Sequence, residues 1–442
     1  MEQPQVKVGI MSGKAISFAF PSAYKFDGQD VTGNQEVKLA DGKVEWCGKK
    51  YDSIEFTPIN AEKDFFTLID VTIGVNFHWE RKENQSFRGA LRIIVEGDKL
   101  TAVNVLPIEE YLLSVISSEM SATASLELLK AHAVISRSWL LAQIEKNKEL
   151  ESAETAYCPC TRTEGELVKW YDREDHVNFD VCADDHCQRY QGITRESTQK
   201  VRDAINATFG EILTHNGKLC DARFSKSCGG VFEEFENCWE PTHHDYLVAR
   251  RDSEEPMNFP DLTVEENARE WILSAPKAFC DTHDKEILSQ VLNSYDQETT
   301  DFYRWKVEYT QAEISELIRN RSGEDYGDII DLIPVARGTS GRLYRLKIVG
   351  TKKTQIIGKE LEIRRTLSPS HLYSSAFVVE KEGEENGLPK KFTIKGAGWG
   401  HGVGLCQIGA AVMGAKGYDY LQILKHYFVG ADITKLYTKT QH

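Results

Sequence analysis

The sequence predicts an α+β fold: a mixed sheet core, a helical segment, an N-terminal all-β region and two insertions. Three observations support this class. Residues 1–90 alternate apolar and polar side chains with the period of two that is typical of strands. Two helical patterns follow between residues 106 and 139. Short strand and helix patterns then alternate to the end of the 442-residue chain, which is long enough for about two or three domains.

Composition narrows the possible function classes. The hydrophobic content of 41% and the charged content of 27% are typical of a globular protein. The net charge of −15 argues against a nucleic-acid partner, whose phosphates would be repelled, and against an anionic membrane surface. No apolar run approaches the roughly 18 residues of a transmembrane span. Residues 1–5 also lack the basic start and apolar core of a signal peptide.

The N-terminal domain is predicted to cover residues 1–90 and a second domain residues 91–435. Val6, Val8 and Ile10 begin the alternating pattern of the first strand. Residues 91–95 and 100–105 flank a Glu-Gly-Asp-Lys turn, which predicts a β-hairpin. We expect this hairpin to lead directly into the helical segment.

The helical segment is predicted to contain two helices with Glu119 in the break between them. Pro107 suits the first turn of a helix, where its missing N–H leaves no bond unmade. Residues 117–125 lack helical periodicity and are rich in small polar residues that favour caps. Connectors held by rigid elements often carry catalytic side chains, so Glu119 is a candidate. The alternative is an ordinary solvated loop carboxylate.

The second predicted helix carries two cations on one face. Lys130 and Arg137 are seven residues apart, so they differ by only about 20° around a helix. The same face lies near the apolar run at residues 133–135. Buried cations need an anion there, which predicts either substrate contacts or pairing within the scaffold.

Two stretches are predicted as insertions, one at about residues 146–200 and one, acidic and partly helical, at about 252–303. The first contains a candidate zinc group: His176, Cys182, His186 and Cys187. Two histidines and two cysteines match tetrahedral zinc, and four protein ligands would make the ion structural rather than catalytic. A Cys182–Cys187 disulfide is the alternative, and Cys158 or Cys160 could replace a histidine ligand.

A glycine series from Gly396 to Gly404 places glycine at every second position. In an extended chain one face would be bare, and the other would carry side chains that include Trp399 and His401. The spacing excludes a dinucleotide-binding fingerprint and a P-loop. A bare face predicts close approach of another backbone or of a ligand ring. A tightly packed internal strand pair is the alternative.

Residues 225–239 form a third candidate group, with a Ser-Cys-Gly-Gly turn and three glutamates at 233, 234 and 236. These residues could line a cleft, although a solvated face is the alternative for the glutamates. Ser227 has no histidine near it in the sequence, so a Ser-His-Asp hydrolase is not supported.

Four motifs in this order resemble the SpoIID/LytB family, which comprises stage II sporulation protein D and its amidase-enhancer relatives. The most specific motif runs from Val105 to Arg137 and includes Ser118-Glu119-Met120. The others lie at residues 223–230, 337–342 and 398–409, and the resemblance covers about residues 91–433 outside the insertions. His132, Cys228 and Cys406-Gln407-Ile408 stand where the family usually has Gln, Ser and Ser-Gln-Tyr.

The resemblance implies a lytic transglycosylase that cleaves MurNAc–GlcNAc bonds in peptide-stripped peptidoglycan glycan strands and leaves 1,6-anhydroMurNAc ends. Glu119 would be the single catalytic acid and base, and the zinc would be structural. Substrate contacts are expected from Lys130, Arg137, Ser225, Ser227, Gly229, Gly230, Trp399, His401 and Gln407. The alternative is a non-catalytic, peptidoglycan-binding enhancer of a cell-wall amidase. Both activities imply an extracytoplasmic location, with a signal peptide removed ahead of Met1.

Overall fold

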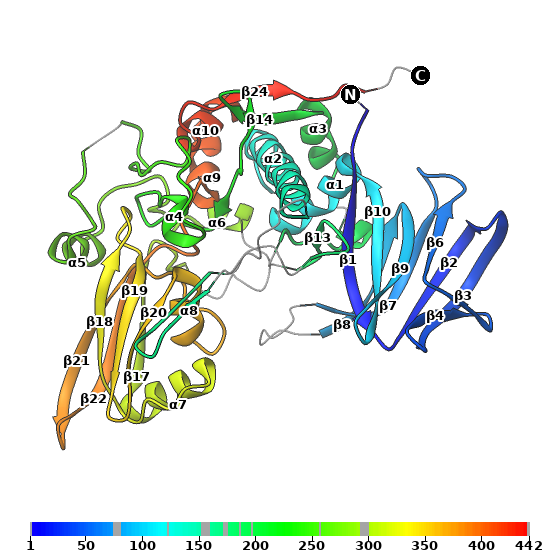
Figure 1. The fold of residues 1–442 in the computed structure, drawn as a ribbon. Coiled ribbons are helices and arrows are strands. Elements are labelled where there is room, and N and C mark those ends of the chain that lie inside the picture. The colour runs from blue at the N-terminus through cyan, green and yellow to red at the C-terminus, as the bar shows by residue number, and fades with distance from the viewer. Residues whose placement is uncertain are drawn as a thin grey trace.

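The structure, a computed structural model, describes residues 2–73, 81–121, 123–151, 160–170, 176–184, 187–195, 198–255, 258–291 and 300–439. It has the predicted α+β class, with several sheets and an N-terminal all-β region. Figure 1 shows the N-terminal sheet (blue to cyan) on one side and the later sheets (yellow to orange) on the other. The main helices lie between and above them. No described helix is both long and apolar enough to cross a membrane.

The N-terminal sheet has eleven strands, ordered β13-β1-β10-β9-β6-β2-β3-β4-β5, with β7 pairing with β2 and β8. Its strands are β1 (Gln5–Gly13), β2 (Ala15–Phe26), β3 (Gln29–Ala40), β4 (Lys43–Trp46), β5 (Lys49–Tyr51), β6 (Ser53–Pro58), β7 (Phe65–Ile73), β8 (Arg81–Arg88), β9 (Ala90–Glu96), β10 (Lys99–Pro107) and β13 (Val181–Cys182). Strands β9 and β10 form the predicted hairpin. Because β9 and β10 pair with β6 and β1, the sheet continues across residue 90, and no boundary between sheets falls there.

Helices α1 (Ile108–Glu119) and α2 (Leu126–Glu151) follow the hairpin. The start after Pro107 agrees with the prediction, but α1 continues through the two serines that were assigned to the break. Its last turn is closed by a 2.9 Å hydrogen bond from the Met120 N–H to the Ile116 carbonyl. Ile116 and Met120 are both buried, and burial of this kind overrides the weak helix propensity of serine. Glu119 is therefore the last residue of a helix.

The first predicted insertion connects the two sides of the molecule. Strands β11 (Cys160–Arg162) and β12 (Glu166–Lys169) pair as a hairpin, and β12 runs parallel to β20 (Thr354–Gly358). Strand β13 pairs with β1 of the N-terminal sheet instead. The segment ends in a 3-10 turn, η2 (Gly192–Arg195), and α3 (Gln199–Ala207). Its described parts are thus integral to both sheets.

The later part of the chain forms several smaller sheets. Strands β18 (Ile329–Arg337) and β19 (Leu343–Gly350) complete the sheet of β20, β12 and β11, while β17 (Arg304–Thr310), β22 (Leu388–Ala397) and β21 (Phe377–Glu385) form another. The remaining elements are β14 (Glu211–His215), β15 (Lys218–Leu219), β16 (Phe224–Ser225), β23 (Leu405–Cys406), β24 (Asp432–Lys435), α4 (Phe235–Cys238), α5 (Glu265–Leu273), α6 (Lys285–Val291), α7 (Gln311–Ser322), α8 (Glu360–Thr366), α9 (Gln407–Ala415) and α10 (Tyr420–Tyr427).

The glycine series is a loop rather than the predicted extended strand. Strand β22 ends at Ala397, and every second residue from Gly398 to Gly404 has a positive φ, between 72° and 94°. A Cβ on Gly402 would lie 2.5 Å from the Arg342 guanidinium, and one on Gly404 would lie 2.1 Å from the Arg223 carbonyl. The alternate glycines thus permit left-handed backbone and close packing against neighbouring chain segments.

Candidate functional site

Glu119 lies half-buried at the C-terminal end of α1. Its Oε1 accepts a hydrogen bond of 3.3 Å from the backbone N–H of Arg189. The last carbonyls of a helix carry partial negative charge, which disfavours a further negative charge at that end. The last turn of α1 contains no basic residue to offset it. The helix end disfavours a negative charge on this carboxyl group, and the Arg189 N–H favours one.

The segment that carries Arg189 is packed along α1 by aromatic and polar contacts. The rings of Tyr111 and Tyr190 are stacked with centroids 5.0 Å apart. The Tyr190 hydroxyl donates to Asn104 Oδ1 at 2.6 Å, and the Gln191 N–H donates to Ser114 Oγ at 3.0 Å. These bonds tie the segment to both β10 and α1, so the backbone donor facing Glu119 is held by rigid elements.

Most of the predicted zinc group is assembled in the same place. His176, Cys182 and Cys187 offer ligand atoms that all lie within 4.8 Å of one another. The Cys182 N–H donates to Cys187 Sγ at 3.5 Å, and no disulfide joins these two cysteines. His186 and Cys158 lie outside the described residues. One imidazole and two thiols fit a zinc ion in ligand type, so this group could hold a metal.

The buried Tyr111 lies close to both the candidate metal group and Glu119. Burial, followed by the nearby Cys187 and Cys182 thiols, raises the pKa of Tyr111 well above its ordinary value, and Glu119 contributes in the same direction. The Tyr111 hydroxyl therefore stays protonated, and it donates to Gln188 Oε1 at 3.4 Å. Cys187 precedes Arg189 by two residues, so a metal held there would fix the backbone that faces Glu119.

Arg137 belongs to the scaffold, which corrects the expectation that it contacts substrate. Its side chain is completely buried, and Nε and Nη2 donate to both carboxylate oxygens of Glu109 at 2.9 and 2.7 Å. Its Nη1 donates to the Glu211 carbonyl at 2.8 Å. Glu109 also accepts from the Tyr437 hydroxyl at 2.7 Å and from the Gly210 N–H at 3.2 Å. This network joins α1, α2 and the C-terminal segment.

Lys130 is paired as well, but it remains partly accessible. Its Nζ lies 2.7 Å from Glu127 Oε1 on the same helix and 5.6 Å from the centre of the Tyr420 ring. Its side chain is 19% exposed. A substrate contact from Lys130 stays a prediction, since a partly exposed lysine can exchange one anion for another.

The Ser-Cys-Gly-Gly turn and the glycine loop lie directly against each other. The Ser227 N–H donates to the Trp399 carbonyl at 3.0 Å, and the Trp399 N–H donates back to the Ser227 carbonyl at 2.8 Å. The Gly402 N–H donates to Ser225 Oγ at 3.2 Å. Ser225 and Ser227 are buried, as are Gly229 and Gly230 of the same turn. These four residues therefore shape the backbone around the loop, and direct side-chain contact with substrate is not supported for the two serines.

Trp399 and His401 remain half-buried at this junction. The Trp399 ring stacks on Phe302, with centroids 4.7 Å apart, and the His401 ring meets Trp239 edge-on at 4.8 Å. Burial, followed by the neighbouring Arg223 and other arginines, holds the pKa of His401 well below its ordinary value, so the ring is neutral. A neutral imidazole and a half-exposed indole suit an uncharged ligand better than an anionic one.

Gln407 is buried in the core rather than facing a ligand, which corrects its predicted role. Its Nε2 donates to His132 Nε2 at 3.1 Å, and His132 Nδ1 lies 3.1 Å from Ser136 Oγ. Burial, followed by the charge of Lys226, lowers the pKa of His132 to about 3, so this histidine is neutral. The hydrogen bond between Gln407 and His132 therefore joins α9 to α2.

The end of helix α6 bonds to both the α1–α2 connector and the residue before the Ser-Cys-Gly-Gly turn. The N–H groups of Ser121 and Ser125 donate to the backbone carbonyl and the side-chain oxygen of Gln290, at 2.9 and 3.2 Å. Lys226 Nζ donates to the Val291 carbonyl at 2.5 Å. The predicted acidic second insertion thus supports the α1–α2 connector and the Ser-Cys-Gly-Gly turn together.

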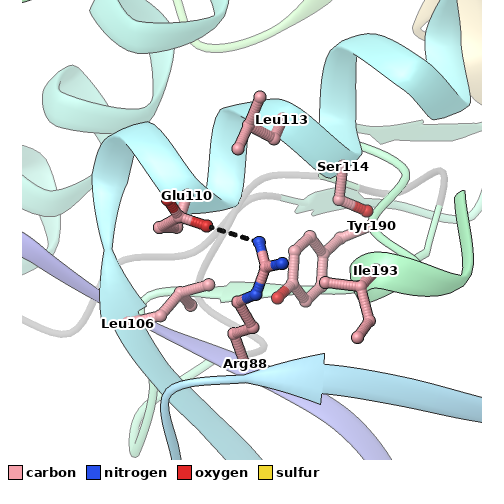
Figure 2. A pocket seen from close by; sticks show the side chains of 8 residues that line it. Arg88, Leu106, Glu110, Leu113, Ser114, Tyr190 and Ile193 are labelled. Carbon is pink, nitrogen blue, oxygen red and sulfur yellow. Dashed lines mark hydrogen bonds and ion pairs between the residues drawn. The ribbon is translucent and has the colours of Figure 1, made fainter. Parts of the chain in front are cut away.

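Two hollows lie along the first half of α1. Figure 2 shows the smaller one, where the Arg88 guanidinium points towards Glu110, with Nη1 3.4 Å from Oε2. The larger hollow, of about 510 Å³, extends between α1, α3 and the N-terminal sheet. Their lining residues on α1 end at Ser114. Glu119 lies nine residues beyond Glu110, or about 13 Å further along the helix, so it does not line either hollow.

Sequence reasoning missed the residues that hold Glu119 in place. The run Gln188-Arg189-Tyr190-Gln191 mixes polar and aromatic residues directly after the Cys187 ligand candidate. That combination inside an otherwise polar insertion was the available signal. One partner of Glu119 is a backbone N–H, and no side-chain pattern identifies such a donor.

Comparison with known proteins gives two matched regions. The chain matches the family of stage II sporulation proteins (SpoIID) over residues 96–215, and a domain of unknown function (DUF8618) over residues 233–404. Stage II sporulation protein D of Bacillus subtilis (strain 168) is 24% identical over 76% of each chain. These matches support the assignment of the chain to the SpoIID/LytB family.

Two further relatives extend the picture. An uncharacterized protein of Brachyspira hyodysenteriae is 26% identical over 78% of this chain and 72% of its own length. The amidase enhancer of Bacillus subtilis is 24% identical over 72% of this chain but only 40% of its own length. The SpoIID match includes Glu119 and the His/Cys group, whereas Trp399 and His401 fall in the second matched region.

Proposed function

We propose that this SpoIID/LytB member is a peptidoglycan lytic transglycosylase that cleaves MurNAc–GlcNAc bonds of peptide-stripped glycan strands. The observation that carries the proposal is the position of Glu119, half-buried at the end of α1 with a backbone N–H on one carboxyl oxygen. Relatives named stage II sporulation protein D and amidase enhancer support a cell-wall related function. A substrate in the cell wall is extracytoplasmic.

Glu119 acts as the single general acid and base in this mechanism. Its carboxylic acid protonates the glycosidic oxygen as the bond to C1 of MurNAc breaks. The resulting carboxylate takes the proton of the 6-hydroxyl of the same MurNAc, and that oxygen attacks C1 to close the 1,6-anhydro ring. The Arg189 N–H stabilises the carboxylate between the two steps. No hydrolytic water and no second carboxylate are needed, in contrast to most glycosidases.

The residues around Glu119 position it. His176, Cys182, His186 and Cys187 would hold a structural zinc ion, which contributes folding energy to the segment it closes. Tyr111, Tyr190 and Gln191 keep that segment against α1. Trp399 offers an aromatic surface for a neutral sugar ring, and Lys130 a cation for a MurNAc carboxylate.

Digestion of peptide-free glycan strands, with mass spectrometry of the products, tests the proposal. We expect 1,6-anhydro-ended fragments from the wild type and none from the Glu119→Gln variant. Glu110→Gln, on the same helix and paired with Arg88, is the matched control and should retain cleavage. Reducing ends would instead indicate hydrolysis by water, and would overturn the transglycosylase assignment.

A non-catalytic enhancer of a cell-wall amidase is the second candidate, favoured by the similarity to the amidase enhancer. It predicts binding to glycan strands without any cleavage products, together with faster release of peptides by an added cell-wall amidase. The two candidates differ in the Glu119→Gln variant, because an enhancer that only binds would keep its stimulation when this carboxylate is made neutral.

A further inference from the structure

A second cluster of metal-ligand side chains lies away from the His/Cys group. Four segments that are distant in the sequence each contribute one residue. Cys228 comes from the turn after β16, Asp252 follows the strand-like pairing of Val231 with Arg251, Cys280 lies between α5 and α6, and Cys406 ends β23. All four are buried, with exposures of 0 to 2%. We propose that Cys228, Asp252, Cys280 and Cys406 hold one structural zinc-class metal ion.

The spacing of the ligand atoms fits a single tetrahedral ion. The three sulfurs and one carboxylate oxygen all lie within 4.8 Å of one another. Cys228 Sγ is 3.5 Å from Cys280 Sγ and 3.5 Å from Asp252 Oδ2. Zinc–sulfur bonds of about 2.3 Å and zinc–oxygen bonds of about 2.1 Å in a tetrahedron separate the ligand atoms by roughly 3.6–3.8 Å. A disulfide would instead require about 2.05 Å, and the three cysteines are free.

The carboxylate of Asp252 is oriented by groups outside the cluster. Its Oδ1 accepts from the Tyr427 hydroxyl at 3.0 Å and lies 3.3 Å from His426 Nε2. Its Oδ2 faces the thiols and accepts from the Cys280 N–H at 3.1 Å. A ligating carboxylate in a metal site is held in this way by hydrogen bonds from neighbouring residues. A completely buried carboxylate beside three thiols needs positive charge nearby, which the His426 ring can supply when it is protonated and a metal ion would supply directly.

The sulfurs are also surrounded by backbone donors. The Cys228 N–H points to Cys406 Sγ at 3.3 Å, and the Gly409 N–H in the first turn of α9 does so at 3.4 Å. The Gly230 N–H points to Cys228 Sγ at 3.4 Å. Such N–H···S contacts stabilise thiolates, the form in which cysteine binds a metal.

The ligand set selects the kind of ion and its role. Thiolates favour zinc over magnesium or calcium, which prefer oxygen ligands. Four protein ligands fill a tetrahedral shell and leave no position for water or substrate, so the ion would be structural. It would join the Ser-Cys-Gly-Gly turn, the loop at residue 252, the segment before α6 and the start of α9. That junction also supports the glycine loop that carries Trp399.

Metal analysis of the full chain, purified under reducing conditions with zinc in the medium, tests this inference. We expect two zinc ions per chain, one in each cluster. Cys280→Ser and Cys187→Ser should each lower the content to one, and the double variant should hold none. Cys220→Ser, which removes a buried cysteine outside both clusters, is the matched control and should keep two. The readout needs no enzymatic activity, so it is independent of the proposed function.

A second measurement covers the case in which Cys280→Ser fails to fold. In the Cys187→Ser protein, cobalt added in place of zinc should give the absorption of thiolate-to-cobalt charge transfer. Chelator should remove that absorption and make Cys228, Cys280 and Cys406 react together with an alkylating reagent, while Cys220 stays unreactive. Retention of two ions in Cys280→Ser, absence of the cobalt absorption, or a Cys228–Cys280 disulfide in the unreduced protein would each overturn the proposal.

Discussion

The two ends of α1 carry the same residue type in opposite settings. Glu109, in the first turn, is 7% exposed, and its carboxylate is bound by Arg137, Tyr437 and Gly210. Glu119, the last residue, is half-buried and accepts a backbone N–H from Arg189. The carboxylate of Glu109 is paired with the Arg137 guanidinium, and that of Glu119 accepts from the backbone of a distant segment. The sequence motif contains both glutamates, and the structure distinguishes them by the helix end that each occupies and by their burial.

The partial charges at the two ends of α1 also affect Glu109 and Glu119 differently. A carboxylate in the first turn of a helix is stabilised by the partial positive charge of the free N–H groups, and one in the last turn is destabilised. Glu109 therefore occupies the favourable end and Glu119 the unfavourable one. Proteins accept locally unfavourable placements chiefly at functional sites. Changes at the two ends should accordingly affect different quantities.

The largest effect is expected at the scaffold end. Arg137→Met leaves the Glu109 carboxylate buried without its cation, which should lower the free energy of unfolding by about 3–5 kcal/mol. A urea titration followed by circular dichroism measures the change. Combining Arg137→Met with Glu109→Leu removes both charges and should recover most of the loss. If the double variant were as unstable as the single one, the packing of Arg137 rather than its charge would carry the effect.

The next effect concerns rate rather than stability. Glu119→Gln removes the proposed acid and base, and should lower glycan-strand cleavage at least about 100-fold. The same variant should be as stable as the wild type or slightly more so, by up to about 1 kcal/mol, because a charge is removed from the negative end of the helix. Product formation over time and the urea midpoint measure the two quantities. A large loss of stability would mean that Glu119, like Glu109, serves mainly to stabilise the fold.

The sequence predicts local features well where one period or turn dominates. The N-terminal strands, the hairpin at residues 91–105 and the start of α1 after Pro107 agree with the structure, because alternation and turn chemistry act over a few residues. The end of α1 was placed too early, since the propensity of two serines was outweighed by burial of Ile116 and Met120. The glycine series was assigned to a strand because spacing alone does not reveal the sign of φ.

Long-range partners were beyond sequence reasoning. The Arg189 N–H that faces Glu119 is 70 residues away in the chain, and Glu109 is 28 residues from Arg137. Arg137 and Gln407 were expected at the substrate because charged and amide side chains often bind ligands. In the structure Arg137 pairs with the buried Glu109, and Gln407 bonds to the buried His132. The three His and Cys residues that the structure describes were recognisable because metal ligands cluster within twelve residues of sequence.

A smaller effect is expected when the support of Glu119 is loosened without touching its carboxyl group. Cys187→Ser removes a ligand candidate two residues before Arg189 and should lower cleavage about 10–100-fold, the usual range for groups that orient a site. Zinc content, measured on the same samples, should fall by one ion per chain. Cys47→Ser, which removes an exposed thiol from the turn between β4 and β5, is the control and should retain both. If the variant lost the ion but kept full activity, the metal would not be needed to position Glu119.

The smallest effect is a pH dependence of stability in the scaffold. Burial, with Lys226, lowers the pKa of His132 from 6.5 to about 3, so the folded chain keeps this ring neutral while the unfolded chain takes up a proton below pH 6.5. The stability that His132 contributes is therefore complete above pH 6.5 and is lost as the pH falls towards 3. Its slope is up to about 1.4 kcal/mol per pH unit.

His132→Gln removes that titration while keeping an amide opposite Gln407. The urea midpoints of wild type and variant, measured from pH 7 to pH 4, should converge or cross as the pH falls, because only the wild type loses the contribution of this histidine. Cleavage at pH 7 should be unchanged, since His132 bonds to Ser136 and Gln407 within the core. Parallel stability curves would mean that His132 also stays neutral in the unfolded chain or becomes charged in the folded one. A fall in cleavage at unchanged stability would mean that His132, and with it α2, contributes to catalysis rather than to the stability of the fold.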